Sequence, residues 1–332
     1  MVATLAVSGI LVFIGVAVIG GCRARQRIRA EFIPSGRWAN LGGRQVHYQV
    51  LGEGGPTIVL EAGQNNSSIT WCLVAPELAK HARVFLYDRP GLGWSEPSES
   101  PRTAAVITEE LHRLLLQEGI PGPYILVGHS MGGLYAKVFA AHHPDEVKAV
   151  VFVDAANEQQ RRRWSAAQEA ATVRLIANLQ RQFRIYAWLA STGIMALAPE
   201  KIPVDPRLTP AAAAEYRAQL AKGPEVFDTM IRELEAQATS FTEVQAMAIK
   251  KLEAPVVVLR RGRPFPMGAP EDLPPGTVEE TERTWRQLQE DTAMLSASGR
   301  VVEAQNSGHD IQLDEPQLVV NAILSVFPST SP

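Results

Sequence analysis

The sequence predicts an α/β fold with a doubly wound, mostly parallel sheet. The first observation is a series of short, apolar and β-branched runs, each suited to one buried strand: residues 57–60, 84–87, 124–127, 149–153 and 256–259. The second is that helix-like segments separate these runs, as where Ile107, Leu111 and Leu114 share one face. Strands that alternate with helices favour a parallel sheet covered on both faces.

The first 22 residues carry no charged side chain, and an apolar run of this length can span a bilayer. Four arginines follow it: Arg23, Arg25, Arg27 and Arg29. We expect residues 1–22 to form a transmembrane helix and residues 23–35 a basic linker. The arginines lie after the span, so we expect the following domain to be cytoplasmic. A cleaved signal peptide and a lipoprotein signal at Cys22 are the alternatives, and either would make the chain exported or lipid-anchored.

The elements after the linker divide into a core and an insertion. We assign residues 36–156 to the first part of the core and residues 252–328 to the second part. A hairpin is expected at 38–52 because Gly42 and Gly43 form a turn signal. Residues 157–251 are mostly helical in character and contain no convincing strand. Further helices are expected at 71–81, 103–118, 134–142 and 316–327.

Composition narrows the class of protein. The chain has 332 residues, of which 46% are hydrophobic and 20% charged, which suits one large globular domain with an insertion. The net charge of −3 gives no reason to expect a nucleic-acid partner. The two cysteines, Cys22 and Cys72, cannot form a disulfide framework and have no zinc-like spacing. We therefore expect no metal site.

The most specific motif is Gly-His-Ser-Met-Gly-Gly at residues 128–133. It follows an apolar run and precedes a helix-like segment, so the chain must turn sharply from strand into helix. A side chain at either glycine that flanks the central tripeptide would collide with neighbouring backbone, and the turn pushes Ser130 clear of the sheet. The helix N-terminus beside Ser130 favours negative charge there.

From residue 37 to about residue 327 the chain resembles an α/β-hydrolase of the lipase and esterase type. Five stretches carry the resemblance, in the order and at the spacing typical of that family: residues 57–64, 84–95, 128–133, 151–155 and 308–309. The resemblance implies that residues 157–251 form a helical cap over the active site. Helices packed only on the sheet are the alternative.

The resemblance also implies roles for individual residues. Ser130 is the expected nucleophile, and His309, which follows the strand-like residues 300–304, is the expected base. The oxyanion intermediate would accept hydrogen bonds from two backbone N–H groups. One belongs to Met131, the residue after the nucleophile, and the other to Gln64, which matches the third residue of the family's His-Gly-x turn. Ala62 stands where the family commonly has histidine.

The acid of the triad departs from the common family pattern. That acid usually follows the strand after the cap, where this chain has Arg260 and Arg261 and no carboxylate. The nearest downstream candidates are Glu271 and Asp272. We choose Asp154 instead, because a carboxylate at the end of the 149–153 strand can reach the far nitrogen of His309. A helix-capping role is the alternative for Asp154.

These residues together predict a serine hydrolase that cleaves a carboxylic ester, either a small molecule or a lipid-like one, through an acyl-serine intermediate. The chemistry needs no cofactor. An acyltransferase or a thioesterase would use the same triad, and an inactive binding protein could share the fold. Epoxide hydrolases and haloalkane dehalogenases of this family carry aspartate at the nucleophile position, so Ser130 argues against both activities.

Overall fold

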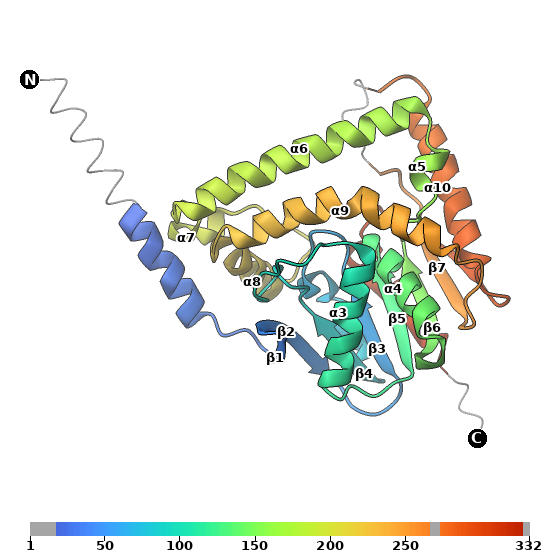
Figure 1. Ribbon diagram of the computed structural model, residues 1–332, viewed down its shortest axis with the longest axis horizontal. Coiled ribbons are helices and arrows are strands. Elements are labelled where there is room, and N and C mark those ends of the chain that lie inside the picture. Colours follow the sequence, from blue (N-terminus) through green and yellow to red (C-terminus); the bar gives the residue numbers. More distant parts are fainter. Residues whose placement is uncertain (1–17, 266–272, 328–332) are drawn as a thin grey trace, which may run out of the picture.

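The computed structural model describes residues 18–265 and 273–327. Its centre is an eight-stranded sheet in the order β1-β2-β4-β3-β5-β6-β7-β8 (Figure 1). The strands are β1 Arg37–Leu41, β2 Arg44–Leu51, β3 Thr57–Glu61, β4 Arg83–Tyr87, β5 Tyr124–His129, β6 Val147–Val153, β7 Val256–Arg261 and β8 Arg300–Ala304. Only β2 runs antiparallel to its neighbours β1 and β4, and the remaining pairs are parallel. The predicted mostly parallel sheet is confirmed.

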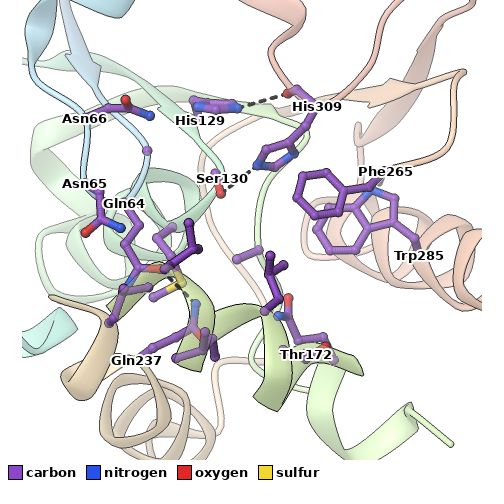
Figure 2. Close-up of a pocket in the computed structure, with 18 of the residues that line it drawn as sticks. Gln64, Asn65, Asn66, His129, Ser130, Thr172, Gln237, Phe265, Trp285 and His309 are labelled. Carbon is purple, nitrogen blue, oxygen red and sulfur yellow. Dashed lines mark hydrogen bonds between the residues drawn. The ribbon is translucent and has the colours of Figure 1, made fainter. Parts of the chain in front are cut away.

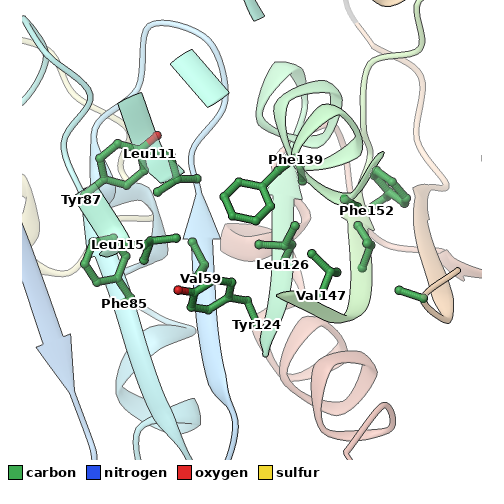
Figure 3. Close-up of a cluster of buried hydrophobic side chains, with 14 of the residues drawn as sticks. Val59, Phe85, Tyr87, Leu111, Leu115, Tyr124, Leu126, Phe139, Val147 and Phe152 are labelled. Atoms are coloured by element: carbon green, nitrogen blue, oxygen red, sulfur yellow. The ribbon is translucent and has the colours of Figure 1, made fainter. Parts of the chain in front are cut away.

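Helices cover both faces of this sheet. On one face, α3 (Ala104–Gln117) and α4 (Met131–His142) place Leu111, Leu115 and Phe139 against the side chains of β3, β4 and β5 (Figure 3). The long helix α10 (Thr277–Ala293) belongs to the same side. On the other face, α2 (Ala75–Leu78) and α12 (Pro316–Leu324) pack on the sheet, and the short α11 (Ile311–Asp314) precedes α12. The sheet is therefore doubly wound, as predicted.

The segment expected as one helix at 71–81 is split in two. A 3₁₀ turn, η1, covers Ser68–Trp71, and α2 begins only at Ala75. Pro76 stands in the first turn of α2. Proline has no N–H to donate and its ring clashes with the preceding turn, so a helix can start at this proline but cannot run through it.

Between β6 and β7 the chain forms only helices, which we call the helical insertion. They are α5 Gln160–Arg163, α6 Ala166–Ser191, α7 Ile194–Leu197, α8 Pro210–Ala221 and α9 Glu225–Met247, with a 3₁₀ turn η3 at Pro199–Lys201. The longest, α6, begins with a reciprocal capping box between Ser165 and Gln168. Figure 1 shows α6 and α9 side by side beyond one edge of the sheet. Phe241 and Val244 anchor the end of α9 on α3 and α4.

The N-terminal segment differs from the expectation. Residues 18–31 are helical, so most of the segment predicted as a basic linker belongs to a helix. This helix contacts the insertion: Arg25 donates to the carbonyl oxygen of Ala190, and Arg29 lies 3.2 Å from the carboxylate of Glu225. Its Ala24 and Ile28 pack against apolar residues of the insertion.

The predicted membrane location is contradicted. Among residues 18–265 and 273–327, no helix has both the length and the apolar character needed to cross a bilayer. This finding overturns the expected single-pass anchor with a cytoplasmic catalytic domain, and with it the expected membrane contact through that helix. Residues 1–17, the greater part of the predicted span, lie outside the described residues. The span was predicted only from an uncharged run followed by arginines. Such a pattern cannot show that Arg25 and Arg29 contact the insertion.

Candidate active site

Ser130 occupies the sharp turn between β5 and α4. Its φ of +52° is a conformation that residues with a side chain rarely adopt, and it aims the hydroxyl away from the sheet. The turn is possible because Gly128 and Gly132, two residues before and after Ser130, have no Cβ. A Cβ on Gly132 would lie 2.6 Å from the carbonyl oxygens of Ala62 and Glu61, and one on Gly128 would collide with the backbone of Gly132. The predicted strand–turn–helix around Ser130 is present.

The structure brings Ser130, His309 and Asp154 together. His309 Nε2 lies 3.0 Å from Ser130 Oγ (Figure 2). On the other side of the ring, His309 Nδ1 lies 2.7 Å from Asp154 Oδ2. Ser130 follows β5, Asp154 follows β6 and His309 follows β8, so all three come from the carboxyl edge of the sheet. Glu271 and Asp272, the alternative acids, lie outside the described residues.

Asp154 is fully buried and surrounded by donors. Its Oδ1 accepts hydrogen bonds from the Arg261 backbone N–H at 3.1 Å and from Trp285 Nε1 at 2.8 Å. Its Oδ2 accepts from Arg261 Nη1 at 2.8 Å as well as from His309. Burial alone would raise the pKa of the Asp154 carboxyl. The Arg261 guanidinium and the His309 hydrogen bond outweigh burial, so the pKa is lowered and the group stays ionised at neutral pH.

Met131 and Gln64, the residues expected to form the oxyanion site, belong to different elements beside Ser130. Met131 begins α4, and Gln64 lies in the loop after β3. Both residues line the cavity beside Ser130. Among the described residues, neither backbone N–H has a hydrogen-bond acceptor. The pair is therefore free to donate to a negatively charged oxygen next to Ser130.

From its place beside Ser130 in the elbow, His129 is expected to point its side chain away from the cavity, and this expectation is wrong. It is buried, lines the cavity, and its Nε2 lies 3.0 Å from the backbone carbonyl oxygen of His309 (Figure 2). A carbonyl accepts, so Nε2 carries the proton. Burial and the neighbouring His309 lower the pKa of His129 to about 4, which keeps its ring neutral.

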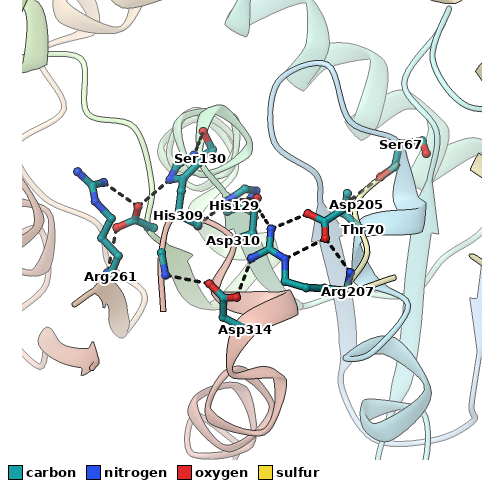
Figure 4. A network of polar contacts seen from close by, with 12 residues as sticks. Ser67, Thr70, His129, Ser130, Asp205, Arg207, Arg261, His309, Asp310 and Asp314 are labelled. Atoms are coloured by element: carbon teal, nitrogen blue, oxygen red, sulfur yellow. Dashed lines mark hydrogen bonds and ion pairs between the residues drawn. The ribbon is translucent and has the colours of Figure 1, made fainter. Parts of the chain in front are cut away.

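A second polar network holds the loop that carries His309 (Figure 4). Arg207, between η3 and α8, lies 2.9 Å from Asp310 and 2.7 Å from Asp314. Asp314 also accepts a hydrogen bond from the Gly308 N–H at 2.8 Å. The insertion is thereby joined to the residues on both sides of His309.

The cavity in front of Ser130 has a volume of about 270 Å³. One wall comes from α6, which presents Thr172, Leu175, Ile176 and Leu179 at helical spacing. Leu234 and Gln237 of α9 and the aromatic rings of Phe265 and Trp285 complete much of the rest. Apolar walls with a few polar groups at one end are typical of a site for a small organic ligand.

Arg261 and Trp285 were not identified as site residues from the sequence. The sequence held one clue to Arg261, which is that the usual carboxylate after β7 is missing. An arginine stands there instead, and it pairs with Asp154. Trp285 lies on α10, and only the folded chain brings it to Asp154.

One group of side chains could hold a metal ion, although no metal site was predicted. His112, His143 and Glu146 each offer one ligand atom, and these atoms lie within 4.8 Å of one another. None of the three lines the cavity in front of Ser130.

Comparison with known proteins identifies the family. A family model described as "Alpha/beta hydrolase family" matches residues 58–322. The chain belongs to the alpha/beta hydrolase family. The match spans the elbow, the insertion and the loop of His309, so the predicted resemblance is confirmed.

Two individual relatives match shorter stretches of the chain. An uncharacterized protein of Schizosaccharomyces pombe is 46% identical over 86 residues, and this stretch spans 26% of the chain but only 16% of that protein. The pimeloyl-[acyl-carrier protein] methyl ester esterase of Yersinia enterocolitica is 32% identical over 110 residues, or 33% of the chain and 40% of the esterase. The solved epoxide hydrolase CorEH superposes with a TM-score of 0.59 at 20% identity, covering 87% of the chain and 97% of CorEH. That likeness shows the fold alone.

Proposed function

We propose that this alpha/beta hydrolase cleaves a carboxylic ester through an acyl-serine intermediate. The observation that carries the proposal is the unbroken hydrogen-bonded series from Ser130 through His309 to Asp154 at the end of an apolar cavity. Such a series, with a base between a nucleophile and an orienting acid, is the arrangement that activates a hydroxyl.

Each proton has a defined place in this reaction. The ionised Asp154 accepts the Nδ1 proton of His309, which leaves the Nε2 lone pair directed at Ser130. His309 takes the hydroxyl proton as Ser130 Oγ bonds to the ester carbon, and then gives that proton to the departing alcohol. Water, activated by the same His309, hydrolyses the acyl-serine. The N–H groups of Met131 and Gln64 stabilise the oxyanion formed in both halves.

The cavity suggests an uncharged, largely apolar substrate. Among the described residues that line it, the charged side chains are Arg261, which is paired with Asp154, and Asp310, which is paired with Arg207. The stripe on α6 offers a wall for an acyl chain or an apolar alcohol group. We therefore propose esters of apolar acids. The similarity to a methyl ester esterase over part of the chain supports ester cleavage.

Epoxide opening is the rival suggested by the superposition with CorEH. A likeness at 20% identity carries the fold and not the chemistry. The residue at the elbow is serine rather than the aspartate expected of an epoxide hydrolase, and this favours ester cleavage. Transfer of the acyl group to an alcohol or thiol would proceed through the same acyl-serine.

Turnover of p-nitrophenyl esters by the purified chain tests the proposal. Ser130→Ala should lower kcat by a factor on the order of 10⁶, because it removes the nucleophile. His309→Ala should lower kcat by a similar factor, and the double variant by little more, because nucleophile and base act as one unit. Adding an alcohol or thiol acceptor and measuring the ratio of transfer product to free acid then separates a hydrolase from an acyltransferase. Ser130→Ala that retains wild-type turnover would contradict the proposal.

A further inference from the structure

A buried ion cluster lies beneath the loop that carries Gln64. Arg89, just after β4, is 1% exposed, and it sits between Glu61 at the end of β3 and Glu233 on α9. Arg89 Nη1 lies 2.6 Å from Glu61 Oε1, and Arg89 Nε lies 2.8 Å from Glu233 Oε1. Three buried charged groups are costly unless each is fully bonded. The proposed reaction uses none of them directly.

All five N–H groups of the Arg89 guanidinium have acceptors. Besides the two carboxylates, Nη1 donates to the carbonyl oxygen of Ala62 at 2.8 Å, and Nη2 donates to that of Gly63 at 2.8 Å and to Glu233 Oε2 at 3.1 Å. The bond to Gly63 matters for the site. In a planar trans peptide the C=O and the N–H point in opposite directions. Holding the Gly63 oxygen on Arg89 therefore directs the N–H of Gln64 the other way, toward the cavity.

Glu233 secures the next peptide of the loop, between Gln64 and Asn65. Its Oε2 accepts a hydrogen bond from the Asn65 backbone N–H at 2.7 Å, in addition to the bond from Arg89. The Gln64 side chain donates to the Glu233 carbonyl oxygen at 2.7 Å and accepts from Gln237 at 2.9 Å. Asn65 is held at a φ of +64°, a conformation that these bonds maintain. Arg89 therefore fixes the peptide before Gln64, and Glu233 of α9 fixes the peptide after it.

We propose that Glu233 is a positioning residue that aligns the oxyanion-binding N–H of Gln64. It acts by orienting Arg89 and by binding the Asn65 N–H, so that correct seating of α9 completes the oxyanion site. The proposal rests on the proposed ester hydrolysis and adds a residue from the insertion to it. Neither the nucleophile nor the base touches Glu233.

The test is Glu233→Gln, which keeps the size of the side chain. Each Glu233 oxygen accepts from at least one N–H donor, so an amide nitrogen in either orientation would face a donor. We expect kcat to fall by about 10²-fold, the lower end of the loss seen when an oxyanion donor is removed, with KM nearly unchanged. The affinity for an aryl boronic acid, which forms a tetrahedral adduct on Ser130, should fall by the same factor as kcat/KM. Binding of a non-hydrolysed amide analogue should not change.

Glu225→Gln is the matched control, because Glu225 lies on the same helix and pairs with exposed Arg29 away from the cavity. It should turn over like the wild type. If Glu233→Gln does not fold, Glu233→Asp takes its place, since it keeps the negative charge but its shorter side chain cannot hold both Arg89 and the Asn65 N–H. It should also lower kcat with little change in KM. Equal turnover by wild type and variant, or an equal loss for the boronic acid and the amide analogue, would overturn this proposal alone. A wild-type chain without esterase activity would instead contradict the proposed function.

Discussion

Asp154 illustrates how one residue organises the site. It follows β6 with a φ of +41°, a conformation maintained by the four donors that surround its two oxygens. Two of the donors belong to Arg261 and one to Trp285, so the carboxylate is fixed before it meets His309. The orientation of the Asp154 carboxylate is therefore set by hydrogen bonds that do not depend on substrate.

Asp154→Asn tests this role. The amide nitrogen would face a donor in either orientation, and if it faces His309 the imidazole must change tautomer and direct a proton at Ser130. We expect kcat for a p-nitrophenyl ester to fall by about 10³–10⁴-fold, following the effect of the same change in a serine protease triad. Far-ultraviolet circular dichroism should stay that of the wild type.

The alternative acids supply the comparison. Glu271→Gln and Asp272→Asn should each lower kcat by less than about tenfold, since the triad would keep its acid, Asp154. A large loss at Glu271 or Asp272, with Asp154→Asn still active, would show that the wrong carboxylate has been chosen.

His129 predicts a specific dependence of stability on pH. Its pKa is about 4 in the folded chain, lowered by burial and by His309 from 6.5 in the unfolded chain. Below pH 6.5 the unfolded chain therefore binds a proton that the folded chain does not bind, and the free energy of unfolding falls until about pH 4. The loss reaches about 3 kcal/mol. Asp154, whose pKa is lowered, loses its contribution only at more acidic pH.

Thermal unfolding between pH 7 and pH 4 measures this effect. The Tm of the wild type should fall more steeply with acid than the Tm of His129→Gln, because glutamine can still donate to the His309 carbonyl but does not titrate. Parallel curves for the two proteins would show that His129 is protonated alike in the folded and unfolded chains.

The sequence was informative about residues whose roles are local. The glycines around Ser130 imply a turn by sterics alone, and Asp154 was chosen from its place at the end of a predicted strand. His129 was misjudged because the direction of its side chain depends on Gly63 and on the loop of His309, both far away in the chain. Local pattern carries no information on such contacts.

At the scale of elements, α6 forms one wall of the cavity. Its Thr172, Leu175, Ile176 and Leu179 recur at intervals of three and four residues, which places them along one face of the helix. Val173 lies on the same helix but is 50% exposed and does not line the cavity. Substitutions on the two faces of α6 should therefore differ in their effect on the size of substrate that the enzyme accepts.

Leu179→Trp should shorten the range of acyl chains that the enzyme accepts. The larger ring would occupy part of the 270 Å³ cavity, so kcat/KM should fall by roughly tenfold or more for long-chain p-nitrophenyl esters, on the scale of a misfit of one or two methylenes. The acetate ester should be little affected. Val173→Trp on the exposed face is the control and should leave the chain-length profile unchanged. An equal loss for all chain lengths from Leu179→Trp would place the acyl chain elsewhere.

The strands were the elements that sequence predicted best. Parallel strands buried on both faces must be apolar throughout, and such runs are conspicuous. The helix expected at 71–81 was wrong in extent because a helix can start at Pro76 but cannot run through it. The helices of the insertion were expected as a group, whereas the face that α6 presents to the cavity depends on where α9 and the sheet lie.

At the scale of the whole molecule, two polar networks join the insertion to the core. Glu233 binds Arg89 beneath the loop of Gln64, and Arg207 binds Asp310 beside His309. Both link segments more than 100 residues apart, so no sequence pattern could have indicated them. The N-terminal arginines are the opposite case. Their pattern predicted a membrane boundary, whereas in the structure Arg25 and Arg29 contact the insertion.

The central claim is that Ser130 forms a covalent acyl intermediate, and mass spectrometry of the full chain tests it directly. The chain would be quenched in acid during turnover of a p-nitrophenyl ester, digested and mapped, with a fluorophosphonate probe in a parallel sample. We predict that the acyl group and the probe are both found on the peptide containing Ser130, and that neither is found on Ser130→Ala. Ester turnover without a Ser130 adduct, or an adduct on another residue that persists in Ser130→Ala, would contradict the account.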